Sequence, residues 1–210
     1  WAAMFTRYFA RRGVTPPYTE EDYFLHVDGR PRYDGVRAAL ASRGVVLPEG
    51  DPADEPWTET VCGLGNAKNA MFNDILATQG VAPYPGSVRL VEDLRARGTG
   101  VAVVSSSRNA RAVLEAAGIA DRFPVVVDGA VARAEGLAGK PSPETFRRAA
   151  DLLGATVAGS VVIEDAVSGV AAGRAGGFGL VVGVDRGAGE QVLRDAGADV
   201  VVADLAELVP

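Results

Sequence analysis

Residues 161–169 read Val161-Val162-Ile163-Glu164-Asp165-Ala166-Val167-Ser168-Gly169, an apolar run followed by two adjacent carboxylates and small residues. An unbroken Val/Ile run is typical of a parallel strand that is buried on both faces. Open parallel sheets bind ligands at the carboxyl ends of their strands, where this pair of acids lies. Glu164 and Asp165 are therefore either a divalent-cation site or the acidic start of a helix. Taken alone, the pair fits the helix start better.

Apolar runs of this kind alternate with helical segments from residue 83 to residue 210. The other runs are at 101–104, 125–127, 180–184 and 200–202. A loop is expected between the run at 125–127 and Glu144. Strands that alternate with helices predict right-handed βαβ units and a parallel, doubly wound sheet. The expected fold class is therefore α/β, with residues 83–210 forming the core.

Residues 1–82 have a different pattern, with helical periodicity and no comparable strands. The side chains of Trp1, Met4, Phe5, Tyr8 and Phe9 fall on one face of a helix that Gly13 ends. A later helix is expected over residues 66–79. We therefore expect a helical cap domain over residues 1–82, packed above the carboxyl edge of the sheet.

Composition excludes several classes of function. The net charge of -6 over 210 residues argues against a nucleic-acid partner or an anionic membrane surface. No apolar run approaches the ~20 residues that span a bilayer. The single cysteine excludes an intrachain disulfide and suits the cytoplasm. We expect a monomer that other domains could be fused to. The chain starts with Trp1 in what reads as the middle of a helix, so we expect that its true start is missing.

Two further polar segments follow predicted strands. Ser105-Ser106-Ser107-Arg108-Asn109 comes directly after the strand at 101–104. Hydroxyls and backbone N–H groups at a helix start suit a phosphate, but on its own the segment fits a serine cap of the helix better. Lys140 lies in Gly139-Lys140-Pro141-Ser142-Pro143-Glu144, whose prolines fix the loop. Its ammonium could neutralise a phosphoryl group, although a loop lysine is commonly only a surface residue.

A hydroxyl cluster, a lysine loop and an acid pair, in that order and each after a strand, are an unlikely coincidence. Together they resemble the second, third and fourth motifs of the haloacid dehalogenase superfamily, and the likeness extends to its beta-phosphoglucomutase group. In the helical region, Asp28-Gly29-Arg30-Pro31-Arg32-Tyr33-Asp34-Gly35 and Gly65-Asn66-Ala67-Lys68-Asn69 are similar to the cap of that group. The resemblance covers essentially the whole chain.

The resemblance implies a role for each matching residue. Ser105 would bind the transferred phosphoryl group, and Lys140 would stabilise its charge. Asp165 would ligate Mg²⁺ directly, with Glu164 supporting the metal site. The remaining implied contacts are to the substrate's sugar or its other phosphate. They would come from Ser106, Ser107, Arg108 and Asn109 in the core and from Gly29, Arg32, Lys68 and Asn69 in the cap.

One departure from the family is serious. The first motif, an Asp-x-Asp that carries the nucleophile and the acid/base on the first core strand, does not occur here. A sheet without its central strand would leave unpaired edges inside the core. We therefore expect the missing strand to belong to the protein, upstream of Trp1.

The resemblance implies a Mg²⁺-dependent phosphotransferase that acts on sugar phosphates through an aspartyl-phosphate. The main hypothesis is a beta-phosphoglucomutase-like enzyme that interconverts β-glucose 1-phosphate and glucose 6-phosphate. Arg32 and Lys68 favour it, because a bisphosphate intermediate needs a second phosphate site. One alternative is a sugar-phosphate phosphatase of the same superfamily. The other is a catalytically silent domain that binds sugar phosphates or a partner.

Overall fold

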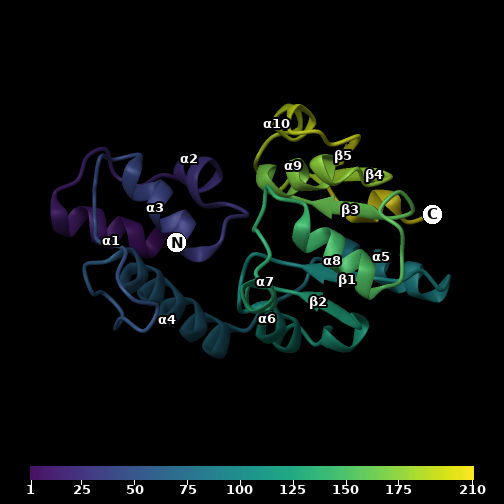
Figure 1. Cartoon of the computed structure of the whole chain (residues 1–210), viewed down its shortest axis with the longest axis horizontal. Helices are drawn as coiled ribbons and strands as arrows, with labels where there is room; N and C mark the ends of the chain where they lie inside the picture. Colours follow the sequence, from purple (N-terminus) through teal and green to yellow (C-terminus); the bar gives the residue numbers. More distant parts are fainter. The chain divides into compact units, whose positions relative to one another are not determined.

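The computed structural model describes all residues from Trp1 to Pro210 and divides into two compact units. Unit 1 comprises Trp1–Gly80 and unit 2 comprises Val81–Pro210. Unit 1 contains only helices, whereas unit 2 alternates strands with helices (Figure 1).

Unit 1 is built around the buried face of its first helix. Its elements are α1 (Ala2–Arg12), α2 (Glu20–Asp22), the π-helix η1 (Tyr23–Val27), α3 (Arg32–Ala41) and α4 (Val61–Gln79). Met4, Phe5, Tyr8 and Phe9 of α1 are all buried in one cluster that also takes residues from α3 and α4. Gly13 ends α1 in the left-handed conformation, with φ 63°. The apolar helical face expected from the sequence is therefore the core of this unit.

Unit 2 follows the expected strand and helix order with small shifts at the ends. Its strands are β1 (Ala102–Val104), β2 (Val125–Val127), β3 (Val161–Glu164), β4 (Leu180–Val184) and β5 (Val200–Val202). Its α-helices are α5 (Pro85–Ala96), α6 (Ala110–Ala116), α7 (Gly129–Glu135), α8 (Glu144–Leu152), α9 (Val167–Gly176) and α10 (Glu190–Asp195). Two 3₁₀ turns, η2 (Ala120–Arg122) and η3 (Leu205–Leu208), complete the unit. Helix α7 occupies part of the segment expected to be a loop.

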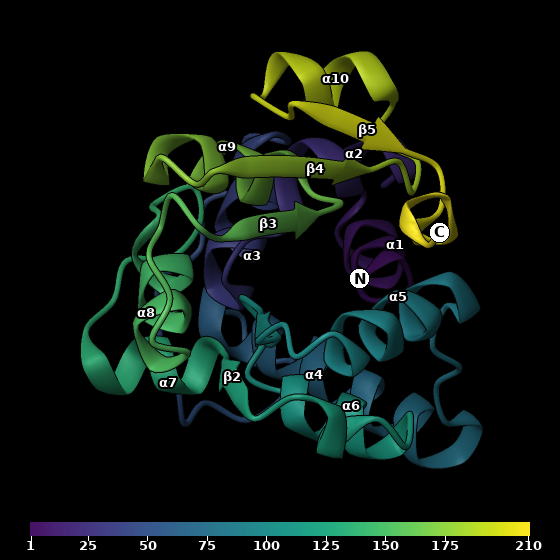
Figure 2. The same cartoon turned by 90° about the vertical axis from the view of Figure 1, so that its right-hand side faces the viewer.

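The strands are all parallel but form two separate sheets. One sheet has the order β1-β2. The other has the order β3-β4-β5, which Figure 2 shows. In register, Val104 lies opposite Val127 in the first sheet, and Glu164 lies opposite Gly183 in the second. The sequence predicts unpaired edges where a central strand is lacking, and β1 and β3 each have a strand neighbour on one side only.

The two sheets share apolar packing. Phe146 of α8, Val162 of β3 and Ala172 of α9 form a buried cluster, and Val104 of β1 packs against it. A second cluster joins α9, β4 and α10 through Val170, Val181 and Leu193. This packing brings the carboxyl ends of β1 and β3 to the same region of the unit.

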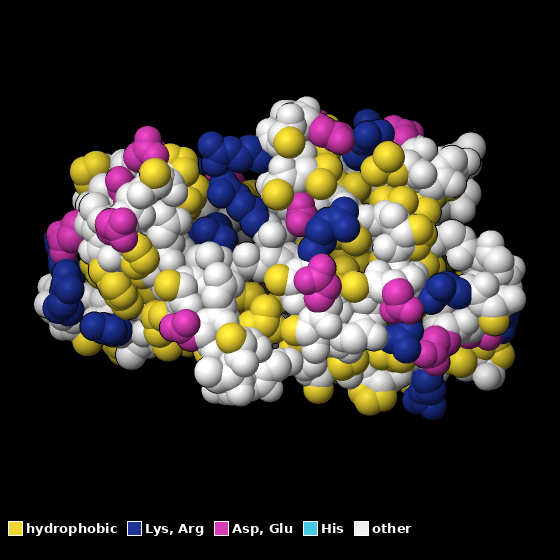
Figure 3. All heavy atoms as spheres, turned by 90° about the horizontal axis from the view of Figure 1, so that it is seen from below, with side chains coloured by type: hydrophobic (Ala, Val, Ile, Leu, Met, Phe, Trp, Pro, Cys, Tyr) yellow, Lys and Arg dark blue, Asp and Glu magenta, His cyan; other side chains and the backbone are white.

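The molecule carries charged side chains of both signs on its surface (Figure 3). None of its helices has the length and apolar character needed to span a bilayer. On the face shown in Figure 3, acidic and basic side chains are interspersed.

Candidate active site

The acid pair lies where β3 ends and α9 begins. Glu164 is the last residue of the strand and is buried, whereas Asp165 is exposed. Ala166 is the N-cap residue of α9 and makes no side-chain cap hydrogen bond. The two neighbouring carboxylates therefore have different environments, because one side chain enters the interior and the other meets solvent.

Lys140 joins the ends of two strands. Its ammonium donates to the Oε1 atom of Glu164 at the end of β3, and to the carbonyl oxygen of Val104 at the end of β1 at 3.3 Å. Its Nζ atom also lies 4.9 Å from the ring centroid of Phe146. Lys140 is only 8% exposed and Glu164 only 9%. The loop lysine is therefore a buried charge with a buried partner, which excludes the surface interpretation of this residue.

The second oxygen of the Glu164 carboxylate is also satisfied. Oε2 accepts the backbone N–H groups of Asp165 at 3.1 Å and Ala166 at 3.2 Å. Burial raises the pKa of Glu164, and the neighbouring Lys140 ammonium opposes that rise. A buried carboxylate with three donors is stable in its ionised form only while the ammonium remains beside it.

The hydroxyl segment folds into a turn between β1 and α6. Ser105 donates its N–H to the carbonyl of Val127 at 3.0 Å, which extends the pairing of β1 with β2. The Oγ of Ser105 accepts the N–H of Ser107 at 3.1 Å, and the Oγ of Ser107 accepts the N–H of Asn109 at 3.1 Å. Asn109 is the N-cap residue of α6 but makes no side-chain cap hydrogen bond. Ser107 and Arg108 are exposed, while Ser106 is half-buried.

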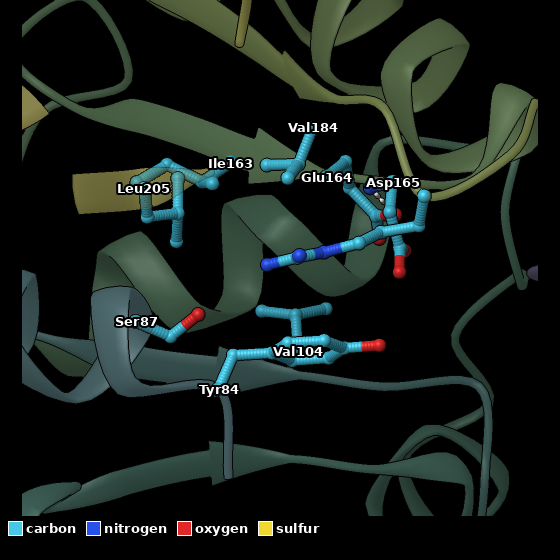
Figure 4. Close-up of a pocket in the computed structure, with 9 residues that line it drawn as sticks. Tyr84, Ser87, Val104, Ile163, Glu164, Asp165, Val184 and Leu205 are labelled. Atoms are coloured by element: carbon cyan, nitrogen blue, oxygen red, sulfur yellow. Dashed lines mark hydrogen bonds between the residues drawn. The ribbon is translucent and has the colours of Figure 1, made fainter. Parts of the chain in front are cut away.

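A cavity of about 260 Å³ lies beside the acid pair. Both Glu164 and Asp165 line it, together with Val104 from β1 and Ile163 from β3, whose side chains lie on opposite sides of it in Figure 4. Arg186, also in the lining, stacks its guanidinium 3.7 Å from the ring centroid of Tyr84. The lining of the cavity is therefore mixed, with apolar side chains beside the charged groups of Glu164, Asp165 and Arg186.

The residues singled out in the helical region meet within unit 1. Arg32 begins α3, while Lys68 and Asn69 lie on α4. Arg32 donates to the side-chain oxygen of Asn69 at 2.6 Å. Gly29 lies in the turn before α3 with φ 68°, a conformation that favours glycine.

Lys68 lies between aromatic rings in this cluster. Its Nζ atom is 5.1 Å from the ring centroid of Trp1 and 4.6 Å from that of Phe72. Burial, with a smaller contribution from the nearby Arg32, lowers the pKa of Lys68 to about 8. A concentration of positive charge that is partly removed from water is suited to an anionic group.

A family model of haloacid dehalogenase-like hydrolases matches residues 18–177, which is most of the chain. The chain belongs to this family. Within it, the chain belongs to the beta-phosphoglucomutase-like group. The order of hydroxyl segment, lysine loop and acid pair therefore pointed to the correct superfamily, and the α/β fold class is confirmed.

Three relatives of this haloacid dehalogenase-like protein illustrate the range of the group. A beta-phosphoglucomutase of Mycobacterium tuberculosis is 50% identical over 219 residues, covering 100% of this chain and 83% of the relative. A trehalose-phosphate phosphatase of Mycobacterium leprae is 38% identical over 145 residues, covering 67% of this chain and 32% of the relative. The crystal structure of beta-phosphoglucomutase from Clostridium difficile superposes with a TM-score of 0.77 at 21% identity, covering 98% and 84% of the two chains.

Two residues of this haloacid dehalogenase-like chain that the sequence did not single out also shape the site. A Cβ atom at Gly169 in α9 would overlap the carboxyl group of Glu164, so only glycine leaves that carboxylate in place. Phe146 covers the Lys140 ammonium. Gly169 could have been found from the sequence, because it lies in the first helical turn after the acid pair. No local sequence feature marks Phe146.

The acid pair could hold Mg²⁺ only together with ligands from outside the pair. No group of three or more His, Cys, Asp or Glu side chains is arranged to hold a metal ion. Mg²⁺ commonly takes one or two carboxylates from a protein and completes its shell with waters and phosphate oxygens. Asp165 is exposed and makes no ion pair, so it is suited to that role. Glu164 is held by Lys140 and would contribute only if that ion pair rearranged.

Proposed function

We propose that this polypeptide is a Mg²⁺-dependent phosphotransferase acting on sugar phosphates through an aspartyl-phosphate. The observation that carries the proposal is the position of Lys140, which joins the carboxyl ends of β1 and β3 through Val104 and Glu164, the residue before Asp165. A fixed cation beside exposed carboxylate oxygen, at the strand ends of a parallel sheet, is the arrangement that phosphoryl transfer requires. The 50% identity to a beta-phosphoglucomutase supports the same class of substrate.

The residues of this chain would act by binding and charge neutralisation. Ser105 would donate to the phosphoryl oxygens, and Lys140 would neutralise the negative charge that develops on them. Asp165, with Glu164, would hold Mg²⁺, which lowers the charge repulsion between the phosphoryl group and an attacking carboxylate. Ser106, Ser107, Arg108 and Asn109 would contact the rest of the substrate.

The nucleophile would be an aspartate on a strand upstream of Trp1. Its carboxylate oxygen would form a bond to phosphorus while the bond from phosphorus to the sugar oxygen breaks. A second aspartate would supply the proton that the leaving sugar oxygen takes. The aspartyl-phosphate would then pass its phosphoryl group either to another sugar hydroxyl or to water.

Arg32 and Lys68 support transfer to a sugar hydroxyl, which makes the enzyme a mutase. A bisphosphate intermediate needs a second group of cations for the phosphate that is not being transferred, and these two residues lie together in unit 1. We therefore favour interconversion of β-glucose 1-phosphate and glucose 6-phosphate. The likeness to a trehalose-phosphate phosphatase supports a phosphatase as the second candidate.

Product analysis separates the two candidates. The polypeptide that includes the upstream strand is incubated with Mg²⁺, β-glucose 1-phosphate and a catalytic trace of glucose 1,6-bisphosphate. Glucose 6-phosphate formed without inorganic phosphate is the expected result. Inorganic phosphate and glucose without isomerisation would establish the phosphatase instead. If neither product forms, while the sugar phosphate still binds in a calorimeter, the domain is a silent binding module.

A further inference from the structure

The motifs of unit 1 contain three residues to which the proposed function gives no role, Tyr33, Gly65 and Asn66. Tyr33 follows Arg32 in the first turn of α3. Gly65 and Asn66 come shortly before Lys68 in α4. Since Arg32 and Lys68 are the two cations proposed for the second phosphate, the three residues are neighbours of that site along the chain.

Gly65 leaves the space in which α3 meets α4. A Cβ atom at this position would lie 2.7 Å from the Cδ1 atom of Tyr33 and 3.2 Å from the Cδ atom of Arg32. Non-bonded carbon atoms are best separated by about 3.5–4.0 Å, so a methyl group would displace both side chains. The side chains of Arg32 and Tyr33 therefore lie directly against the backbone of Gly65.

The side chain of Asn66 joins Tyr33 to the loop that precedes α4. Its Oδ1 atom accepts a hydrogen bond from the Tyr33 hydroxyl at 3.0 Å. Its Nδ2 atom donates to the carbonyl oxygens of Pro52 at 3.1 Å and Asp54 at 2.8 Å. A reversed amide would place its oxygen against two carbonyl oxygens, so only this orientation satisfies all three partners. The first turn of α3 is thereby fixed to α4 through Tyr33.

The guanidinium of Arg32 is held by Asn69. The Nη2 atom of Arg32 donates to the Oδ1 atom of Asn69 at 2.6 Å. Gly65 and Asn69 are four residues apart in α4, so they lie on the same face of that helix. Arg32 thus extends along one helical turn, from Gly65 to Asn69. Its Cζ atom also lies 6.0 Å from the centroid of the Tyr33 ring.

These contacts keep two positive charges close together. Lys68 immediately precedes Asn69, and the nearby Arg32 contributes to the lowered pKa of Lys68. Like charges repel, so an Arg32 side chain without these contacts would turn away from Lys68. The fixed course of Arg32 across α4 opposes that movement.

We infer that Tyr33, Gly65 and Asn66 are positioning residues for the second phosphate site. This role rests on the proposed function, because it concerns the same site. None of the three needs to touch the phosphate. They hold Arg32 beside Lys68 before a ligand arrives, and a cation that is already in place loses less conformational freedom when the phosphate binds, which raises affinity.

The first test removes one hydroxyl group from the polypeptide that includes the upstream strand. Tyr33→Phe deletes the hydrogen bond to Asn66 and keeps the ring. Tyr18→Phe is the matched control, because it deletes a buried hydroxyl of unit 1 that has no hydrogen-bond partner. Binding of glucose 1,6-bisphosphate is measured by calorimetry without Mg²⁺. Tyr33→Phe should weaken binding about fivefold, the equivalent of one hydrogen bond, and Tyr18→Phe should leave it unchanged.

A phosphoryl donor without a second phosphate separates positioning from a general loss of structure. Acetyl phosphate carries one phosphoryl group, so with Mg²⁺ it should phosphorylate the wild type and Tyr33→Phe at the same rate. With glucose 1,6-bisphosphate well below its KM, the rate should fall in Tyr33→Phe by the same factor as binding. Gly65→Ala should show the same difference between the donors. Gly35→Ala in α3, whose Cβ atom would meet Val27 at an ordinary 3.4 Å, should alter neither rate.

Lys68 gives a measurement that needs neither ligand nor turnover. Lys140 is the only other lysine of the 210 residues, so the side-chain NMR signals of Lys68 can be assigned and titrated. The pKa of Lys68 should be higher in Tyr33→Phe than in the wild type, because Arg32 withdraws from it. The Tyr18→Phe variant should keep the wild-type value.

Three outcomes would overturn the inference. They are equal weakening of binding by Tyr33→Phe and Tyr18→Phe, an equal fall of both phosphorylation rates in Tyr33→Phe, and an unchanged pKa of Lys68 in that variant. If Gly65→Ala does not fold, Tyr33→Phe still decides the matter. If the wild type neither binds the bisphosphate nor becomes phosphorylated, the proposed function fails, and the titration of Lys68 alone supports or contradicts the positioning role.

Discussion

Lys140 and Glu164 form a buried ion pair between the loop that precedes α8 and the end of β3. Each is less than a tenth exposed, and the same ammonium contacts the Val104 carbonyl at the end of β1. A charge at this depth is tolerated because its partner is beside it and further hydrogen bonds satisfy the carboxylate. The pair therefore contributes to stability as well as to the electrostatics of the candidate site.

Lys140→Met should lower the free energy of unfolding by about 3–5 kcal/mol at pH 7, because it leaves the Glu164 carboxylate buried without a cation. Urea denaturation measures the change. The double variant Lys140→Met with Glu164→Gln removes both charges and should recover most of the loss. A loss below about 1 kcal/mol in the single variant would show that the carboxylate escapes to solvent and that the pair is not structural.

Asp165→Asn should abolish Mg²⁺-dependent turnover by the polypeptide that carries the nucleophile strand. Asp165 is exposed, so its free energy of unfolding should change by less than about 0.5 kcal/mol. Asp151→Asn, at an exposed position of α8, is the matched control and should change neither quantity. Turnover and its dependence on Mg²⁺ concentration are measured for all three proteins. Undiminished turnover in Asp165→Asn would remove this residue from the proposed metal site.

Gly169→Ala should destabilise the protein by about 1–3 kcal/mol, because its Cβ atom overlaps the Glu164 carboxyl group. In an unobstructed helix the same change would be stabilising. Gly100→Ala is the control, since a Cβ atom there would meet Leu153 at an ordinary 3.5 Å. Thermal or urea unfolding gives both values. Equal effects of the two substitutions would mean that Glu164 has room to move away from α9.

Lys68 should give the enzyme a pH dependence at alkaline values. Its pKa is lowered to about 8 from 10.5, so its positive charge is lost as the pH rises through about 8. The KM for a sugar phosphate should therefore rise above that pH, and Lys68→Arg should keep it flat because arginine stays charged. A KM profile that is identical in the wild type and in Lys68→Arg would exclude this lysine from phosphate binding.

The free energy of unfolding should also depend on pH. It should rise over the interval in which binding of the sugar phosphate weakens. The unfolded chain keeps the Lys68 proton up to the ordinary value of 10.5, whereas the folded chain releases it near 8. Because the unfolded state binds more protons between these values, the free energy of unfolding should rise across that interval. Lys68→Met removes the group and should remove this rise, which urea denaturation at a series of pH values would detect.

The short Val-rich strands were predictable because buried parallel strands read as continuous apolar runs, as in Val161-Val162-Ile163. Two helical segments were not. A loop was expected after the strand at 125–127, yet the Asp128 side chain accepts the N–H groups of Ala130 and Val131 and starts α7. Helix α4 begins at Val61 and not near Asn66, because Thr60 is its N-cap residue and the Thr60 hydroxyl accepts the N–H of Gly63.

The candidate site was predictable as a set of residues but not as a set of contacts. The chain order placed Ser105, Lys140, Glu164 and Asp165 after strands, and strand ends meet at one edge of a parallel sheet. The ion pair between Lys140 and Glu164 depends on how α8, β1 and β3 pack together. No local sequence pattern indicates how these three elements pack. The division of the strands into two sheets is likewise marked by no local pattern, and the sequence indicates a lacking strand only through the family resemblance.

In the proposed mechanism a phosphoryl group passes through an aspartate placed opposite Lys140 and Asp165. The most direct measurement is the intact mass of the polypeptide with its upstream strand, after brief incubation with Mg²⁺ and glucose 1,6-bisphosphate and an acid quench. We expect one added phosphoryl group, carried by an aspartate of the upstream strand and absent from Asp165→Asn. A phosphoryl group on a serine, or no adduct in an enzyme that still turns over, would contradict it.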